Sequence, residues 1–419
     1  MAAGYLEILS ARHAARLLAG TLVGRLPNAT AAIALVLFVR AEGGSYSLAG
    51  ALAAVYGVAN AVGQPVLGRL VDLHGQPRIQ LPAAVLSALS MAVFAFCGTD
   101  PLPLACAAVA AAGLFTPPLE GGLRALWPSV LRREEQVHTA YAMDAVAQEV
   151  MFTVGPLLVT LCVSVWSERA ALLVLNGVGV LGALSVVLSP PSRAWRSAPR
   201  EAHWLGPLRS PGLLALFGAF LFVGIALGSI TVASVPYADD HGGDAVYGWL
   251  MAALGLGALA GGTVYGARRW SGAPERRLRV LVALLALCYL PLMLMPGAVV
   301  MVLLTVVAGV FLAPAMACAF VMVDGHAPSG TVTEAFSWLV TTFTVGASVG
   351  TGLAGPVVEA GGALWGFAVP GAAGAVSLLV LLATGRVLAA PGGGAVVAAS
   401  AENDPNRAAE PRFSSGDRA

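Results

Sequence analysis

The hydrophobic residues of the chain fall into about a dozen blocks of roughly twenty residues, separated by short polar segments. A helix of about twenty residues crosses the hydrocarbon core of a bilayer, because it rises about 1.5 Å per residue. The pattern therefore predicts twelve transmembrane helices, over residues 13–39, 48–70, 79–98, 101–124, 139–164, 169–190, 211–236, 245–267, 278–296, 298–323, 333–357 and 362–386.

Composition supports a membrane protein and the distribution of charge predicts its orientation. Apolar residues make up 58% of the chain and charged residues only 11%, which is more apolar surface than a soluble core of this length can bury. The chain has no lysine, and 20 of its 23 arginines fall on one side of the membrane if the N-terminus is cytoplasmic. By the positive-inside rule we expect a multi-pass protein of the cell (cytoplasmic) membrane with both termini cytoplasmic.

The longest polar interruption before the C-terminal tail covers residues 189–210 and separates six predicted helices from six. We therefore expect an N-terminal six-helix bundle over 1–190, a cytoplasmic linker over 191–210 and a C-terminal six-helix bundle over 211–388. Residues 389–419 are poor in bulky apolar side chains, so a disordered cytoplasmic tail is predicted there.

A faint internal repeat relates the two predicted bundles. At an offset of 194 residues, Gly63 and Gly68 of the second helix correspond to Gly257 and Gly262 of the eighth. An offset of 195 similarly relates the fifth helix to the eleventh. Transporters are often built from duplicated halves, so the expected fold class is all-α integral membrane with two pseudo-symmetric six-helix bundles.

The most specific string is GRLVDLHGQPR, which joins the second and third predicted helices. Gly68 allows two helix backbones to approach and Gly75 permits a tight turn. Asp72 is suited to accept hydrogen bonds from helix N-terminal amides or to pair with an arginine, of which Arg124 is the nearest expected partner. Arg78 adds positive charge. The alternative is an ordinary turn with a solvated aspartate.

This string resembles the signature loop of the major facilitator superfamily: a glycine, three residues, an aspartate, two residues, a glycine and then basic residues. The chain departs from it at Gln76 and Pro77, where the family often has basic residues. The resemblance, which covers the whole membrane part, implies the twelve-helix fold of that family and alternating access. It also implies that Asp72 latches the two halves together on the cytoplasmic face. A counterpart around the eighth helix lacks the aspartate.

Ionisable residues inside the predicted helices are informative, because each costs roughly 2.5–3.5 kcal/mol on insertion scales unless it is paired or hydrated. Arg25 and Glu149 are expected at similar depth, where they can form a pair that breaks on protonation or substrate binding. The alternative is a static ion pair that orients two helices. Asp144 lies on the same helix as Glu149, and Glu120 and Arg124 are spaced for a helical ion pair.

Further polar residues predicted to line a cavity are Asn28, Asn60, Gln64 and Gln148. Each is more often an interhelical hydrogen-bonding residue than a substrate ligand. An apolar cavity with few charges suits a moderately hydrophobic, neutral or weakly charged organic compound.

The predicted function is secondary active transport of such a small molecule, with proton-coupled efflux by an antiporter as the first hypothesis. No nucleotide-binding phosphate loop is present in the sequence, so an ion or substrate gradient must supply the energy. The alternatives are uptake of a small metabolite, or a membrane sensor or assembly protein that transports nothing. Neither enzymatic activity nor a cofactor, metal or nucleic-acid partner is expected, and the protein is expected to be a monomer.

Overall fold

Every element that the structure describes is a helix. The computed structural model describes residues 2–389 except 132, 200–204, 269 and 271. The helices of the first half are α1 (Ala2–Ser10), α2 (Ala14–Ala41), α3 (Tyr46–His74), α4 (Gln76–Cys97), α5 (Leu102–Leu114), α6 (Leu119–Val130), α7 (Glu134–Val165), α8 (Glu168–Val187) and α9 (Pro190–Ala194). The others are η1 (Gly206–Arg209), α10 (Pro211–His241), α11 (Asp244–Gly266), α12 (Pro274–Tyr289), η2 (Leu290–Leu294), α13 (Ala298–Gly309), α14 (Leu312–His326), α15 (Val332–Ala383) and α16 (Gly385–Ala389).

The predicted twelve membrane spans are confirmed, although one helix contains two of them. Eleven helices of the described residues are long and apolar enough to cross a membrane. The last, α15, has 52 residues, and Gly362 inside it has a φ of 76° that interrupts the helix. A straight helix of that length would measure about 78 Å, more than twice the roughly 30 Å of the hydrocarbon core. The two spans predicted on either side of residue 360 therefore both exist within α15.

The fourth span is broken in the middle, which the hydrophobic pattern does not reveal. α5 ends at Leu114 and α6 begins at Leu119. Pro117 and Pro118 separate them, and proline has no backbone N–H to continue a helical ladder. The break places Glu120 in the first turn of α6, where the positive end of the helix dipole favours a carboxylate.

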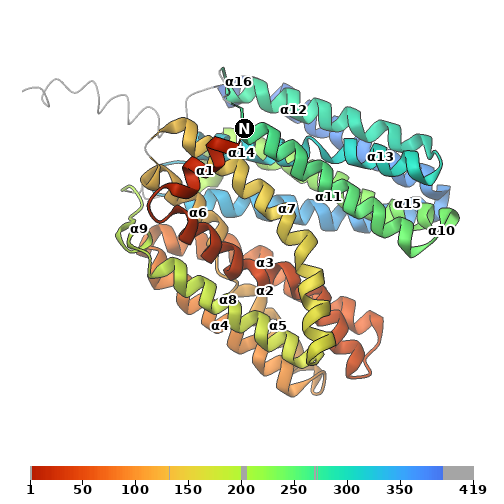
Figure 1. Ribbon diagram of the computed structural model, residues 1–419, viewed down its shortest axis with the longest axis horizontal. Coiled ribbons are helices and arrows are strands. Elements are labelled where there is room, and N and C mark those ends of the chain that lie inside the picture. Colours follow the sequence, from red (N-terminus) through yellow and green to blue (C-terminus); the bar gives the residue numbers. More distant parts are fainter. Residues whose placement is uncertain (1, 132, 200–204, 269, 271, 390–419) are drawn as a thin grey trace, which may run out of the picture.

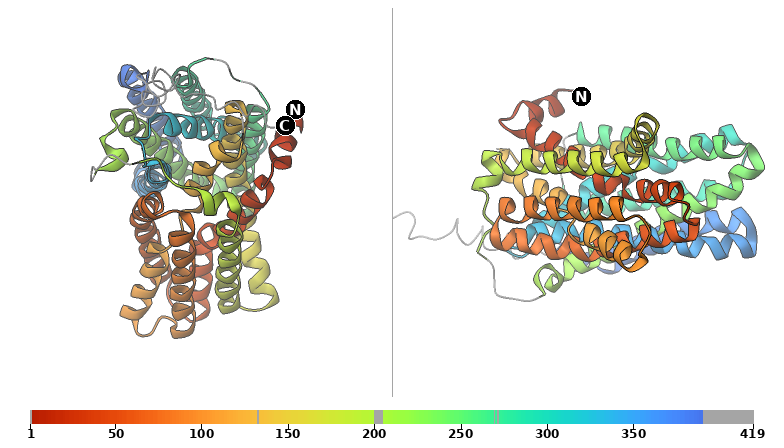
Figure 2. Two further views of the ribbon diagram at one scale, coloured as in Figure 1. Left: turned by 90° about the vertical axis from the view of Figure 1, so that its left-hand side faces the viewer. Right: turned by 90° about the horizontal axis from the view of Figure 1, so that it is seen from below.

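The helices form two groups that meet at one end of the molecule and diverge at the other (Figure 1). α2–α8 pack with one another, and α10–α15 form the second group. Figure 2 shows the groups as separate sets of helices, joined by the connecting segment that contains α9 and η1. We call the end where they meet the closed end; it holds the turn at Gly75 and the start of α15. Part of the predicted linker (200–204) and the predicted tail from residue 390 onward lie outside the described residues.

Equivalent close contacts between helices bear out the internal repeat. In the first half, a Cβ added to Gly63 would overlap the carbonyl of Leu114 on α5. In the second half, a Cβ added to Gly257 would overlap the carbonyl of Val306 on α13. The predicted offset of 194 thus relates two positions that allow the same helix pair to pack backbone against backbone.

The largest cluster of buried apolar side chains joins the two halves at the closed end. It contains Trp127 and Tyr141 from the first half together with Phe320 and Phe336 from the second. A second cluster lies entirely within the first half. Direct contact between the halves is therefore concentrated at one end of the molecule.

Candidate functional site

A polar cavity of about 240 Å³ lies between the two halves, above the closed end. α2, α3 and α7 supply most of its wall, α15 supplies Val340, Thr341 and Thr344, and α6 supplies Glu120. Its polar lining residues are Arg25, Asn28, Tyr56, Asn60, Gln64, Glu120, Gln148, Thr341 and Thr344. Five of the predicted candidates, Arg25, Asn28, Asn60, Gln64 and Gln148, are therefore brought together in one cavity.

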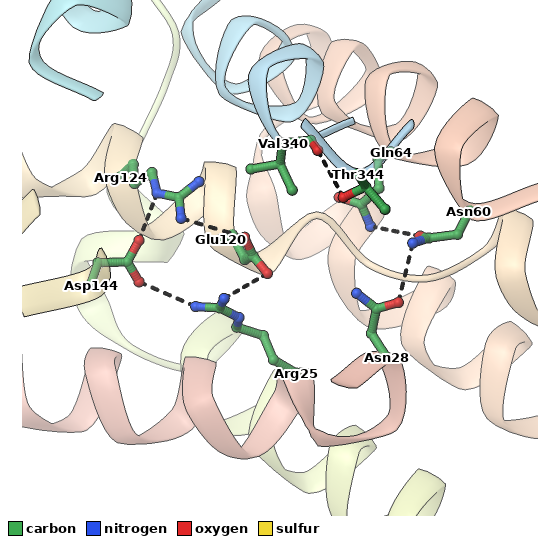
Figure 3. Close-up of polar contacts among 9 residues, drawn as sticks. All are labelled: Arg25, Asn28, Asn60, Gln64, Glu120, Arg124, Asp144, Val340 and Thr344. Atoms are coloured by element: carbon green, nitrogen blue, oxygen red, sulfur yellow. Dashed lines mark hydrogen bonds and ion pairs between the residues drawn. The ribbon is translucent and has the colours of Figure 1, made fainter. Parts of the chain in front are cut away.

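Four charged side chains form a compact cluster beside the cavity (Figure 3). Arg25 pairs with Glu120 at 2.7 Å and with Asp144 at 3.2 Å. Arg124 pairs with the same two carboxylates, at 3.4 Å to Glu120 and 2.6 Å to Asp144. We call Arg25, Glu120, Arg124 and Asp144 the charge cluster. Its formal charges sum to zero, which makes burial of all four groups tolerable.

Members of the charge cluster differ in their access to the cavity. The side chains of Arg124 and Asp144 are 0% exposed, whereas that of Glu120 is 16% exposed and lines the cavity. Asp144 therefore serves as a fixed bridge between the two arginines, and Glu120 is the carboxylate that a solute or proton in the cavity reaches. The predicted ion pair between Glu120 and Arg124 is confirmed.

The predicted pair between Arg25 and Glu149 is wrong, because Arg25 pairs with Glu120 and Asp144. Asp144 and Glu149 are five residues apart on α7, which rotates one side chain about 140° from the other around the helix axis. Asp144 consequently faces α2, while Glu149 points to a different side of α7. The sequence analysis therefore chose the wrong carboxylate of α7 as the partner of Arg25.

Amide side chains form a second group on the other side of the cavity (Figure 3). The Asn60 amide nitrogen donates to Asn28 Oδ1 at 3.1 Å, and the Gln64 amide nitrogen donates to Asn60 Oδ1 at 3.3 Å. Gln64 also donates to the carbonyl of Thr116 at 3.0 Å, in the break between α5 and α6. These amides therefore both tie helices together and present polar atoms to the cavity.

Asp72 holds the start of α15 at the closed end. Its two carboxylate oxygens accept hydrogen bonds from the backbone N–H groups of Thr333, at 3.1 Å, and Glu334, at 2.9 Å. Thr331, the residue before the helix, makes no side-chain cap of its own. A carboxylate from the first half thus caps a helix of the second half, which is the first of the two predicted possibilities for Asp72.

The other predicted gate residues have separate positions. An added Cβ at Gly68 would lie 2.8 Å from Ser337 Oγ, so this glycine allows α3 and α15 to touch. Gly75 has a φ of 87° and forms the turn into α4. Arg78 is exposed on α4. The expected pair between Asp72 and Arg124 is wrong, because the backbone of α15 holds the aspartate and Asp144 and Glu120 hold the arginine.

The departure from the family pattern at Gln76 has a structural reason. Gln76 is completely buried; its amide nitrogen donates to the carbonyl of Gly122 at 2.9 Å, and its oxygen accepts from Ser192 at 2.8 Å. A basic side chain at this position would place an unpaired charge between α6 and α9.

Arg124 connects the charge cluster to the second half. Its guanidinium carbon lies 3.8 Å from the ring centroid of Phe320 on α14 and 5.9 Å from that of Phe336 on α15. Tyr141 packs against the same two rings. The sequence analysis missed Phe320 and Phe336, because a phenylalanine in an apolar helix carries no signal that distinguishes it from a core residue.

The N-terminal helix α1 makes another contact between the halves. Adding 194 to 72 places Gly266 at the position equivalent to Asp72, and an added Cβ there would overlap the Tyr5 hydroxyl. That hydroxyl donates to the carbonyls of Gly262 at 3.3 Å and Thr263 at 3.4 Å. Burial raises the pKa of Tyr5 to about 12, so the hydroxyl keeps its proton near neutral pH. α1 also contacts α7, because the carboxylate of Glu7 on α1 accepts a hydrogen bond from the side-chain amide of Gln136 on α7.

Replacing Tyr5 by phenylalanine is expected to loosen the α7–α11 contact at the closed end. The change removes only the hydroxyl, and a neutral hydrogen bond contributes about 0.5–1.5 kcal/mol. Hydrogen exchange of the neighbouring ends of α7 and α11 should accelerate by about threefold to tenfold. Tyr247→Phe, at the opposite end of α11, is the matched control. Equal exchange in the Tyr5 variant and the unaltered protein would show that α1 does not strengthen this contact.

Comparisons with known proteins agree with this architecture. The family model described as Major Facilitator Superfamily matches residues 17–351. No curated protein sequence matches the chain. The human organic anion transporter MFSD10 (TETRAN) is 17% identical with a TM-score of 0.67, covering 87% of this chain and 97% of its own.

Two other similar structures come from bacteria. A bacterial homologue of the iron transporter ferroportin, in an outward-facing state, is 13% identical with a TM-score of 0.69, covering 89% of this chain and 99% of its own. The E. coli fucose:proton symporter FucP is 15% identical with a TM-score of 0.66, covering 88% and 97%. At these identities the likeness establishes a shared fold and leaves the substrate open.

Proposed function

Because this chain belongs to the major facilitator superfamily, we propose that it works as a proton-coupled exporter of a moderately hydrophobic compound, by alternating access. Membrane transport follows from the family, whereas the direction, the coupling ion and the type of substrate are our proposal. The proposal draws on the polar cavity between two helix groups that meet at only one end.

In the proposed orientation the closed end faces the cytoplasm. The arginine distribution supports this assignment, because the segments at the closed end hold most of the positive charge, such as Arg268 after α11 and Arg276 and Arg277 in the first turn of α12. The cavity would then open to the outer side, in an outward-facing conformation. Rocking of the two halves would expose it to the cytoplasm once the contacts of Asp72 and Arg124 are released.

Glu120 is the observation on which proton coupling rests. Its carboxylate lines the cavity and pairs with both arginines of the charge cluster. A proton on Glu120 would weaken its hold on Arg25 and Arg124 and leave one carboxylate to compensate two guanidinium groups. Because Arg124 also contacts Phe320 and Phe336, such a change would reach the contact between the halves. Proton binding would in this way bias the equilibrium between the two conformations.

Export is favoured by two features. Apolar residues such as Met151 and Val340 supply much of the cavity wall, which suits a compound that partitions into the membrane. The Gly155-Pro156 sequence of α7 resembles part of the antiporter motif of the family. A Cβ added to Gly155 would lie 3.3 Å from Thr30 Cγ2, so this glycine allows α7 to pack closely against α2. The fucose neighbour is, by its name, a proton symporter, so proton coupling with the opposite direction is the natural competitor.

Replacing Glu120 by glutamine is expected to abolish proton coupling, because a side-chain amide neither binds nor releases a proton near neutral pH. Purified protein in liposomes containing a pH-sensitive dye is exposed to a panel of moderately hydrophobic compounds. The unaltered protein should move protons in response to at least one compound, and Glu120→Gln should move none. Thermal unfolding of both proteins checks that the variant is folded.

Glu149→Gln is the matched comparison, because Glu149 is the carboxylate that the sequence analysis proposed as the partner of Arg25. Loss of coupling in Glu149→Gln with normal coupling in Glu120→Gln would assign the proton to Glu149 and contradict our proposal. Absence of gradient-driven movement of every compound in the unaltered protein would instead favour the sensor or assembly protein.

A further inference from the structure

An apolar groove of about 770 Å³ lies beside the polar cavity, between α3 and α15. Its walls carry Val58, Val62 and Val66 on α3 and Val345 and Val349 on α15. These valines are 39–67% exposed, and in a membrane-spanning helix such side chains face hydrocarbon. The groove is therefore a surface that suits an alkyl chain.

The groove and the polar cavity are continuous. Ala53, Gly57, Ala61, Thr341 and Thr344 line both spaces. The three α3 residues recur every four positions and form a stripe of small side chains along that helix. A Cβ added to Gly57 would meet no atom within 4 Å, so the boundary between the two spaces is open at this point.

The register of α3 places different chemistry on the two sides of this stripe. Val58 follows Gly57 by one residue, which rotates its side chain about 100° around the helix axis. Asn60 follows Gly57 by three residues, which places its side chain about 60° to the opposite side. One helix thus presents amides to the cavity and valines to the groove, with small residues between them.

The polar side of this combined space is rich in hydrogen-bonding groups but has no net charge. Asn28, Asn60 and Gln64 offer amide donors and acceptors. The neighbouring charge cluster contains two arginines and two carboxylates. An uncharged or zwitterionic polar group fits this environment, whereas a net charge would find no single opposing charge to pair with.

We propose that the substrate is a single-chain amphiphile that enters from the lipid through the α3–α15 groove, with its alkyl chain along the valines and its uncharged or zwitterionic head among the cavity amides. This inference rests on the proposed transport function and specifies its substrate class. On this route the alkyl chain of the substrate passes from lipid into an apolar groove and never enters water. Between Ala53 and Val66 the groove runs about 20 Å along α3, the length of a medium alkyl chain.

The test uses the full chain in phosphatidylcholine nanodiscs and a dodecylphosphocholine with a photoactivatable diazirine in its alkyl chain. Labelled peptides should map to α3 between Ala53 and Val66 and to α15 between Trp338 and Val349. Gly57→Leu and, one turn further, Ala61→Leu should reduce this labelling by about tenfold, because a leucine there overfills the passage. Gly177→Leu, an open glycine on the exposed surface of α8, should leave it unchanged.

Two results would overturn the inference. One is labelling of the groove that persists in both leucine variants. The other is labelling that glycerophosphocholine, which has the same head and no alkyl chain, suppresses as strongly as unlabelled dodecylphosphocholine does. Absence of groove labelling in the unaltered protein would overturn it too. In that case compound-driven proton movement in the dye assay would show that the transport proposal still stands. Loss of that movement in the unaltered protein would contradict the transport proposal itself.

Discussion

Replacing Asp144 by asparagine is expected to destabilise the protein by about 3–5 kcal/mol and to abolish transport, because removing one partner of a buried ion pair leaves an uncompensated charge. Asp144 is completely buried and bridges Arg25 and Arg124. Without its charge, Glu120 alone would face two guanidinium groups in a low-dielectric interior. Thermal unfolding in detergent measures the first effect and transport in liposomes the second.

The matched control is Asp240→Asn, which neutralises an exposed aspartate at the end of α10. It should leave the unfolding temperature and transport unchanged. The double variant Asp144→Asn with Arg124→Gln removes one charge of each sign, leaves the pair of Arg25 and Glu120 and should recover part of the lost stability. An Asp144→Asn protein with the unfolding temperature of the unaltered chain would contradict the bridging role of this carboxylate.

Arg124 explains why transport should fail even where the double variant regains stability. Its guanidinium group is shared between the charge cluster of the first half and the rings of Phe320 and Phe336 in the second. Cation–π contacts of this kind contribute up to about 2 kcal/mol when desolvated. Glutamine at position 124 would lose them, so the halves would lose a contact that responds to the state of the cavity.

The membrane spans could be predicted from the sequence because lipid imposes one strong requirement. Each span needs about twenty apolar residues with every backbone group bonded internally, and that requirement is visible as a simple pattern. The break between α5 and α6 was missed, since Pro117 and Pro118 sit inside a block that is apolar overall. The turn between the last two spans was predicted at residues 358–361, directly before Gly362, because a hairpin must turn between two spans.

The partners of the buried charges could not be predicted in the same way. Spacing along α7 gives the depths of Asp144 and Glu149, but which of them faces Arg25 depends on how the helix is rotated about its axis. That rotation is determined by packing between helices that are far apart in the sequence. Asp72 presents a different difficulty, because its partners are backbone N–H groups and every residue except proline has one.

The polar cavity itself was within reach of the sequence, since its amides were predicted as polar residues inside the first, second and fifth helices. What the sequence did not reveal is that the two sides of α3 face different spaces. Asn60 faces the polar cavity, Val58 faces the apolar groove, and the stripe of small residues at Gly57 lies between them around the helix axis. The meaning of that stripe depends on the position of α15, which faces it only because Asp72 and Gly68 bring the two helices together at the closed end.

Replacing Asp72 by asparagine is expected to lower the maximal rate of transport by about tenfold or more while changing substrate affinity little. The carboxylate accepts two charge-assisted hydrogen bonds from the first turn of α15, and such bonds contribute about 1.5–3 kcal/mol each. Asparagine keeps one oxygen and turns an amide N–H₂ group toward a backbone donor. The cavity lies away from this contact, so binding residues keep their positions. Initial rates across a range of substrate concentrations separate the two effects.

The rate should fall because the cycle must return to the conformation in which the closed end is sealed. Loss of about 1.4 kcal/mol from that conformation alone lowers its population about tenfold relative to the other. Asp72→Glu, which keeps the charge on a longer side chain, should recover part of the rate, and Asp240→Asn should have no effect. If Asp72→Asn instead raises the Michaelis constant and leaves the maximal rate intact, the capping of α15 does not control turnover, and Asp72 is part of a structural turn.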